Sequence, residues 1–142
     1  MTVAAILKHK GSEVISISPE TSVAALVHLL AERRIGAVPV LDAMGQLLGI
    51  ISERDVVSSL AAKGADVLEM PASAFMTRTP RTGTPATTVQ QAMEIMTNGR
   101  FRHLPILQDN QMIGMVSIGD VVKARISQQT QEVESLKAYV AA

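Results

Sequence analysis

The sequence contains no cysteine and no tryptophan, and only two phenylalanines and one tyrosine among 142 residues. Without cysteine, the chain can form no disulfide framework, thiol nucleophile or thiolate metal site. With so few aromatic rings, it is not expected to bind single-stranded nucleic acid by stacking bases on aromatic side chains. Thiol-dependent enzymes and aromatic-rich nucleic-acid binders are therefore excluded as classes.

The chain also carries no net charge, because 13 basic residues balance 13 acidic residues. No long run of like charge occurs, which argues against a nucleic-acid or membrane-surface partner. No apolar run approaches the length of a membrane span, and residues 1–8 do not resemble a secretory signal. We therefore expect a cytoplasmic protein, with enough apolar residues for a sizeable core.

A repeated stretch dominates the sequence. The segment GIISERDVV at 49–57 returns as GMVSIGDVV at 114–122, and AVPVL at 37–41 returns as HLPIL at 103–107. Internal repeats of this length indicate two copies of one supersecondary unit, over roughly 14–62 and 80–126. One copy of about 50 residues buries its core poorly alone, so the two copies are expected to pack with approximate two-fold symmetry.

Each copy is predicted to run strand–helix–strand–strand–helix, an α+β arrangement. Ser22, Ser52 and Thr88 are predicted N-caps, with Gln91 completing a capping box, and Asn98-Gly99 a predicted helix end. The predicted strands are 14–17, 37–41, 47–51, 103–107 and 112–116, and a short helix covers 3–8. We divide the chain into a first motif at 3–64, a linker with a short helix at 65–79, a second motif at 80–126 and a tail at 127–142.

The tail is polar, but Val133, Leu136 and Val140 share one helical face. Such a segment predicts a marginal helix that needs a partner surface, because short isolated helices are barely stable in water. A frayed terminus is the alternative.

The repeated Ser-x-x-Asp supports two interpretations. As a helix cap, the hydroxyl accepts a hydrogen bond from the first turn and the acid offsets the helix dipole. As a ligand site, the helix N-terminus presents N–H groups to a phosphate, and the aspartate accepts hydrogen bonds from two ribose hydroxyls. Arg54 would add a phosphate contact. Ile17, Val38-Pro39 and Leu104-Pro105 would offer an apolar slot for a purine.

These features together resemble a tandem cystathionine-beta-synthase (CBS) domain pair, also called a Bateman module, over residues 3–126. The resemblance implies an α+β fold in which two pseudo-symmetric β-α-β-β-α motifs pack through their sheets. It implies a regulatory module rather than an enzyme, with no catalytic cofactor, which binds AMP, ATP, NAD or S-adenosylmethionine in clefts between the motifs. It also implies a homodimer of such modules and a separate, unidentified protein partner.

By this resemblance, Asp55 and Asp120 bind ribose, and Ser52 and Ser117 lie near ribose or phosphate. The first site is expected to comprise Ile17, Ser18, Ala37, Val38, Pro39, Ser52, Arg54 and Asp55. The second is expected to comprise Thr77, Gly83, Thr84, Arg102, His103, Leu104, Pro105, Ser117, Gly119 and Asp120. Gly119 replaces Arg54, so the second site needs another cation, for which Arg102, His103 and Arg81 are candidates. The two sites are therefore expected to be unequal.

Two other classes of function are an interaction protein and an enzyme. A structural or interaction protein would use the twin Ser-x-x-Asp only as helix caps and would dock a partner on its tail. An enzyme is not expected, because the acidic residue Glu53 has no accompanying nucleophile and no pair of histidines has metal-ligand spacing.

Overall fold

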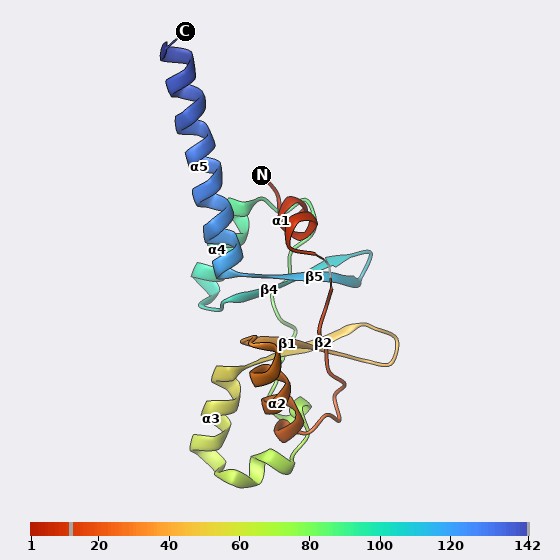
Figure 1. Ribbon diagram of the computed structural model, residues 1–142. Coiled ribbons are helices and arrows are strands. Elements are labelled where there is room, and N and C mark those ends of the chain that lie inside the picture. Colours follow the sequence, from red (N-terminus) through yellow and green to blue (C-terminus); the bar gives the residue numbers. More distant parts are fainter. Residues whose placement is uncertain (12, 142) are drawn as a thin grey trace. The chain divides into compact units, whose positions relative to one another are not determined.

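The computed structural model describes residues 1–11 and 13–141, which form helices and small antiparallel sheets (Figure 1). The described chain divides into two compact units. The terminal unit comprises Met1–Glu13, Arg81–Gln108 and Ile113–Ala142, and the central unit comprises Val14–Pro80 and Asp109–Met112. Each unit carries one copy of the repeat.

The central unit holds the first copy of the repeat. Strands β1, β2 and β3 form one antiparallel sheet in that order, and α2 and α3 contribute side chains to its core. Val23, Leu26 and Leu30 face that core, whereas Val27 of the same helix is exposed. The elements are α2 (Val23–Arg33), β1 (Ala37–Leu41), β2 (Leu47–Ser52), α3 (Glu53–Lys63), 3-10 turns at Ala65–Glu69 and Ala72–Ala74, and β3 (Thr77–Arg78).

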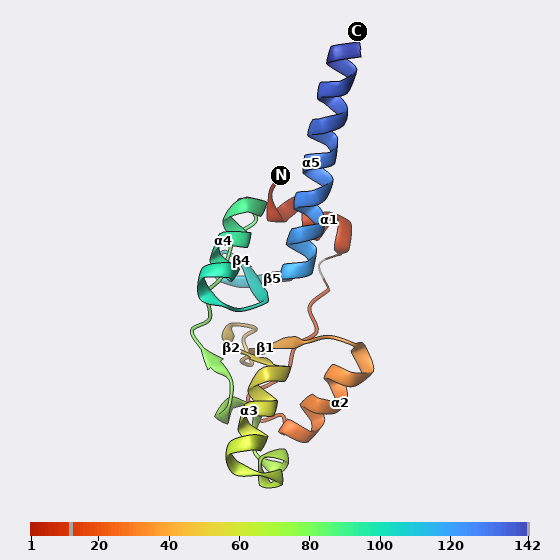
Figure 2. The ribbon, with the colours of Figure 1, turned by 90° about the vertical axis from the view of Figure 1, so that its left-hand side faces the viewer.

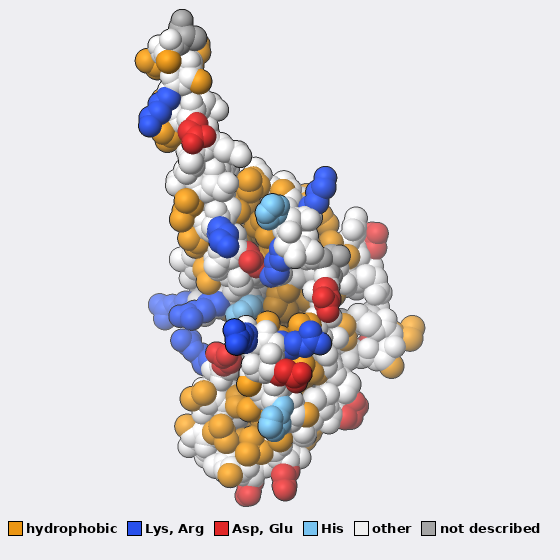
Figure 3. All heavy atoms as spheres, viewed as in Figure 1, with side chains coloured by type: hydrophobic (Ala, Val, Ile, Leu, Met, Phe, Trp, Pro, Cys, Tyr) orange, Lys and Arg blue, Asp and Glu red, His pale blue; other side chains and the backbone are white. Residues whose placement is uncertain are grey.

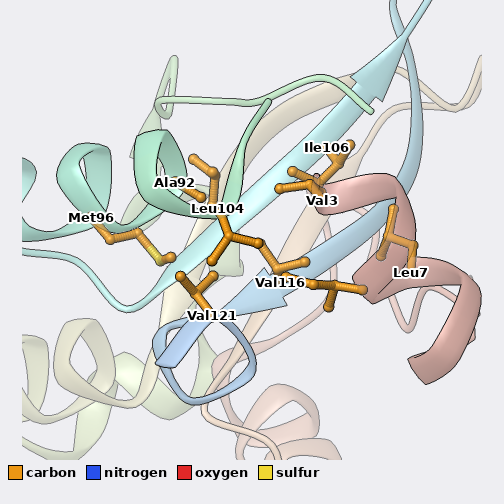
Figure 4. Packing of buried hydrophobic residues seen from close by; sticks show 10 residues of the cluster. Val3, Leu7, Ala92, Met96, Leu104, Ile106, Val116 and Val121 are labelled. Atoms are coloured by element: carbon orange, nitrogen blue, oxygen red, sulfur yellow. The ribbon is translucent and has the colours of Figure 1, made fainter. Parts of the chain in front are cut away.

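The terminal unit holds the second copy, built on a two-stranded sheet of β4 and β5. Figure 4 shows Val3 and Leu7 of α1 lying against the same cluster as Leu104, Val116 and Val121. The buried members of this cluster pack α1, α4 and the start of α5 onto the sheet. The elements are α1 (Val3–Lys10), α4 (Val89–Gly99), β4 (His103–Gln108), β5 (Gln111–Ser117) and α5 (Ile118–Ala141).

The first strand of each copy is reduced to a single parallel bridge. The strand predicted at 14–17 survives only at Ile17, and Gly83 is its counterpart in the second copy. The Ile17 amide donates to the Pro39 carbonyl at 3.1 Å, and the Gly83 amide donates to the Pro105 carbonyl at 2.9 Å. Each proline lacks an N–H but keeps its carbonyl, so it can sit in a buried strand and still accept from a third segment.

The segment that precedes each copy packs on the other copy. The Val3 amide donates to the Thr87 carbonyl at 2.8 Å, and the Ala72 amide donates to the Thr21 carbonyl at 2.7 Å. Helix α1 therefore belongs to the terminal unit, although the sequence-based division at 3–64 placed it with the first copy. Position along the chain suggested that division, whereas burial of apolar side chains decides the packing.

The predicted end of α4 at Asn98-Gly99 is wrong by one residue. The helix includes Gly99, and Arg100 adopts the left-handed conformation that ends it, with φ of 58°. Arg34 ends α2 in the same way, with φ of 55°. Gly99 is required for a different reason, because a Cβ at this position would overlap the ring of Phe101.

The tail predicted as a helix is confirmed as one, and it continues α5 without interruption to Ala141. Both ribbon views show its C-terminal part extending beyond α1 and α4 of the same unit (Figures 1 and 2). Among the described residues, no helix combines the length and apolar character needed to cross a bilayer.

Gly49 in β2 and Gly114 in β5 lie where the chain packs closely, and substitutions at these positions test that packing. A Cβ at Gly49 would lie 2.6 Å from the Thr77 carbonyl oxygen, whereas one at Gly114 would lie 2.7 Å from a methyl group of Leu7. Gly49→Ala should destabilise by about 1–3 kcal/mol, because a backbone oxygen cannot move aside. Gly114→Ala should cost less, because a leucine side chain can repack.

Urea unfolding followed by circular dichroism measures both changes. The matched control is Gly119→Ala, where the added Cβ would meet only the Ser117 hydroxyl at 3.6 Å and a helical alanine is favoured over glycine. Equal losses at Gly49 and Gly119 would contradict the packing argument.

Candidate functional site

The corner where β2 runs into α3 joins Ser52 and Asp55 by reciprocal hydrogen bonds. The Ser52 amide donates to Asp55 Oδ2 at 2.8 Å, and the Asp55 amide donates to Ser52 Oγ at 3.3 Å. Ser52 Oγ also donates to Asp55 Oδ2 at 3.1 Å. This is a complete capping box, and it holds the carboxylate in one orientation at the helix N-terminus.

The corner where β5 runs into α5 repeats this geometry. The Ser117 amide donates to Asp120 Oδ2 at 2.8 Å, and the Asp120 amide donates to Ser117 Oγ at 3.1 Å. The capping interpretation of both Ser-x-x-Asp motifs is thus confirmed. Both aspartates are half-buried, and neither capping bond uses Oδ1.

The two corners differ in charge. Lys10, in the last turn of α1, donates from Nζ to Asp120 Oδ2 at 2.6 Å and to the Met115 carbonyl at 2.9 Å. Within the part of the chain that the structure describes, Asp55 has no such ion pair. Lys10 is therefore the cation paired with the carboxylate of the second corner. Sequence reasoning missed it, since no local pattern links positions 10 and 120.

The environment of Asp120 shifts its acidity. Partial burial would raise the pKa of the carboxyl, but the hydrogen bond from Lys10, the bonds from Ser117 and the charge of Lys10 together outweigh it. The pKa of Asp120 is therefore lowered from its usual value of 3.8. The carboxylate is therefore ionised in the folded protein at neutral pH.

The helix N-termini have fewer available donors than the sequence suggested. The amide of Glu53, first in α3, donates to the Gly36 carbonyl at 2.9 Å, and that of Ile118, first in α5, donates to the Arg102 carbonyl at 2.8 Å. The capping serines occupy the third amide of each helix. The second amide, at Arg54 or Gly119, is the donor that each corner leaves for a ligand.

The side chains expected to hold a base are mostly committed to the cores. Val38 and Leu104 are fully buried and Ile17 nearly so, each within the hydrophobic cluster of its own unit. Their side chains pack against protein, so the contact left to these strands is through the backbone beside Pro39 and Pro105. The apolar character of these residues within short predicted strands is a signal from which this core role could have been predicted.

The remaining residues expected at the two sites lie in turns, on strand ends or on the surface. Ser18 and Thr84 begin exposed turns, and their amides donate to Thr21 Oγ1 at 3.2 Å and to Thr87 Oγ1 at 2.9 Å, respectively. Ala37 is paired with Ser52 across β1 and β2, which brings it to the first corner. Arg54, Thr77, Arg102 and Gly119 are exposed, Gly83 is buried, and His103 is half-buried at the first residue of β4.

A separate hollow of about 300 Å³ lies along α4 in the terminal unit. It is polar and open, and neither Ser117 nor Asp120 lines it. Its lining residues are Arg81, Thr87, Gln91, Glu94, Ile95 and Asn98. Nowhere in residues 1–11 and 13–141 do three or more histidine, aspartate or glutamate side chains gather as a metal site would require.

Comparison with known proteins places the repeat in a family. The family model described as the CBS domain matches residues 5–62 and 72–127. The chain is 34% identical over 147 residues to the mitochondrial CBS domain-containing protein CBSX3 of Arabidopsis thaliana, covering 98% of this chain and 71% of that protein. It is 28% identical to the CBS domain-containing protein YhcV of Bacillus subtilis, covering 84% of each.

Two solved structures of CBS-domain proteins share the fold of this chain. The CBS-domain protein ATU1752 of Agrobacterium tumefaciens is 42% identical, with a TM-score of 0.85 over 88% of this chain and 99% of that one. CBSX2, whose structure was solved in complex with AMP, is 25% identical, with a TM-score of 0.72 over 84% of this chain and 92% of that one.

The ion pair at the second corner predicts a pH dependence of stability. Because the pKa of Asp120 is lowered in the folded state, its ionised form contributes stability above pH 3.8, and that contribution is lost as the pH falls through the folded-state pKa. Lys10→Met should therefore reduce the loss of stability between pH 6 and pH 3, by up to about 1 kcal/mol for a partly exposed pair.

Urea unfolding at the two pH values measures this difference. Lys8→Met removes a lysine from the same helix without touching Asp120, and it should keep the acid sensitivity of the original chain. An unchanged difference in Lys10→Met would show that the ion pair does not couple to folding.

Proposed function

The chain belongs to the CBS-domain family, whose paired domains are generally regulatory rather than catalytic, and from this we propose that it is a sensor of adenine nucleotides. AMP, ATP or NAD would bind at the strand-to-helix corners, and the ligand would alter the interaction with a separate protein partner. The observation that carries the proposal is the doubled corner, in which a half-buried carboxylate is held at a helix N-terminus.

Each corner would divide the ligand between its groups. Oδ1 of Asp55 or Asp120, which the capping bonds do not use, would accept from ribose hydroxyls, and the second helix amide would donate to a phosphate. The backbone beside Pro39 or Pro105 would contact the base edge. The AMP complex of CBSX2 supports this ligand class, since that protein shares the fold over most of its length.

The corners would bind with unequal affinity. At the first, Arg54 is exposed and near the helix start, and it would contact phosphate. At the second, Gly119 offers no cation, and a ribose would share Asp120 with Lys10. The first corner is therefore proposed as the tighter site. A homodimer of modules in the cytoplasm is part of the same proposal.

A structural or interaction module without a nucleotide is the second candidate. The capping boxes favour it, because they explain both serines and both aspartates by hydrogen bonds within the chain. Under this function the corners only start helices, and ligands would leave the protein unaffected.

Titration calorimetry with AMP, ATP and NAD distinguishes the two functions. Asp55→Asn keeps an acceptor for the Ser52 amide but removes the charge that would receive two ribose hydroxyls. It should weaken binding at least tenfold, since charge-assisted hydrogen bonds contribute about 1.5–3 kcal/mol each. Glu53→Gln makes the same charge change two residues away and should bind as before.

No heat with any of the three nucleotides, together with an unchanged melting temperature at millimolar ligand, would reject the sensor and leave the structural module. Equal binding by Asp55→Asn and the unmodified chain would instead reject this corner as the site.

The proposed difference in nucleotide affinity between the two corners can be tested separately. Asp120→Asn should reduce the total number of bound nucleotides but leave the higher-affinity phase intact, whereas Asp55→Asn should remove that phase. Calorimetric isotherms of the two variants measure this directly. A larger loss of affinity in Asp120→Asn would reverse the assignment of the tighter site.

A further inference from the structure

Helix α5 packs on its own unit along only one face and only for its first three turns. Val121 is buried, and Ala124, Arg125 and Gln128 are half-buried on the same face. From residue 129 to residue 141 every side chain is exposed. A helical segment of this length is marginal in water without packing, so its sequence must find a partner surface to hold it.

A second, exposed apolar face runs along the whole helix. Val122, Ile126, Val133, Leu136 and Val140 are between 40% and 78% exposed. Their spacings of four, seven, three and four residues follow the alternating three and four of a coiled-coil heptad. At about 100° per residue, this stripe lies roughly a third of a turn from the face that carries Val121. Both faces can therefore be covered at once. Figure 3 shows hydrophobic side chains continuing along α5 to its end.

We propose that this stripe pairs with the same stripe of a second copy of the chain, as a parallel two-stranded coiled coil. The a positions are Ile126, Val133 and Val140, and the d positions are Val122, Gln129 and Leu136. β-Branched residues at all three a positions, with leucine at one of the d positions, favour two parallel strands. The single polar seam residue, Gln129, disfavours register shifts that would place it against an apolar side chain.

Charges beside the stripe select the parallel orientation. Glu132 occupies a g position and Lys137 the following e position, so in a parallel pair Glu132 faces Lys137 of the partner subunit, twice by symmetry. The antiparallel alignment that overlaps the same stripe brings Glu132 against Glu132 of the partner subunit and Lys123 against Lys137 of the partner subunit. Like charges oppose that arrangement.

Within one helix, Glu132 and Lys137 are five residues apart and do not face each other. Among the described residues neither takes part in an ion pair. Both are thus available to a second copy. This interface is independent of the nucleotide sites proposed above, and it uses none of their residues.

Disulfide cross-linking tests the pairing directly, because the chain has no cysteine of its own. In a parallel pair, the two residues at position 136 face each other, so full-length Leu136→Cys should cross-link rapidly under mild oxidation. Gln131→Cys lies at an f position, on the outside of the pair, and is the matched control. A non-reducing gel over time measures both rates.

Cross-linking of Leu136→Cys no faster than of Gln131→Cys overturns the proposal. Faster cross-linking in a mixture of Ile126→Cys and Leu136→Cys chains than in Leu136→Cys alone shows antiparallel pairing, which also overturns it. A dimer formed only through other surfaces gives the first of these results.

Sedimentation equilibrium tests the charge pairs. Glu132→Lys and Lys137→Glu should each raise the dimer dissociation constant about 2- to 30-fold, the range expected for two exposed ion pairs. The double variant should restore it, because the opposite charges again face each other. Leu136→Glu should raise the dissociation constant more than either charge variant, whereas Ala138→Glu, at an f position, should leave it unchanged. Dimers as strong as those of the original chain in Glu132→Lys, Lys137→Glu and Leu136→Glu would overturn the proposal.

Discussion

Reciprocal hydrogen bonds between a serine and an aspartate hold each strand-to-helix corner in place. The serine amide would otherwise be left unsatisfied at the end of a partly buried strand, where an unpaired donor is costly. Asp55 and Asp120 accept a hydrogen bond from this amide, and the same bond marks the end of the strand and the start of the helix. The direction of α3 and of α5 follows from these bonds, and with it the packing of Val56 and Val121 into the two cores.

The same bonds make the capping and ligand-binding roles compatible. A carboxylate whose Oδ2 is fixed by the chain keeps Oδ1 in a defined direction, and a ligand would not have to order it. The cap thus supplies the preorganisation that a binding site needs. What distinguishes the corners is the surrounding charge, because Lys10 reaches Asp120 and no equivalent residue reaches Asp55 within the described chain.

Helix α5 links a capped corner to an exposed tail. Its first turns are held by Asp120 and by the packing of Val121, which nucleates the helix and removes the costliest step of helix formation. The tail then extends a helix that already exists, and the exposed stripe from Val122 to Val140 keeps a constant orientation relative to the terminal unit. A second copy bound along that stripe would therefore be held in a defined orientation with respect to the second corner.

The sequence by itself determined the repeat, the α+β class, most strand and helix positions, the three caps and the helical tail. These depend on local rules: apolar periodicity, hydroxyl caps and the pairing of Thr88 with Gln91. Local rules failed at the end of α4, where the arginine that takes up a positive φ was not recognised.

Only the tertiary structure decided which copy each opening segment packs on. It also placed Lys10 against Asp120 and turned Val38 and Leu104 into their cores rather than toward a ligand. These outcomes depend on contacts between residues far apart in the chain. Such contacts are chosen by the burial of apolar surface over a whole unit, which no short stretch of sequence encodes.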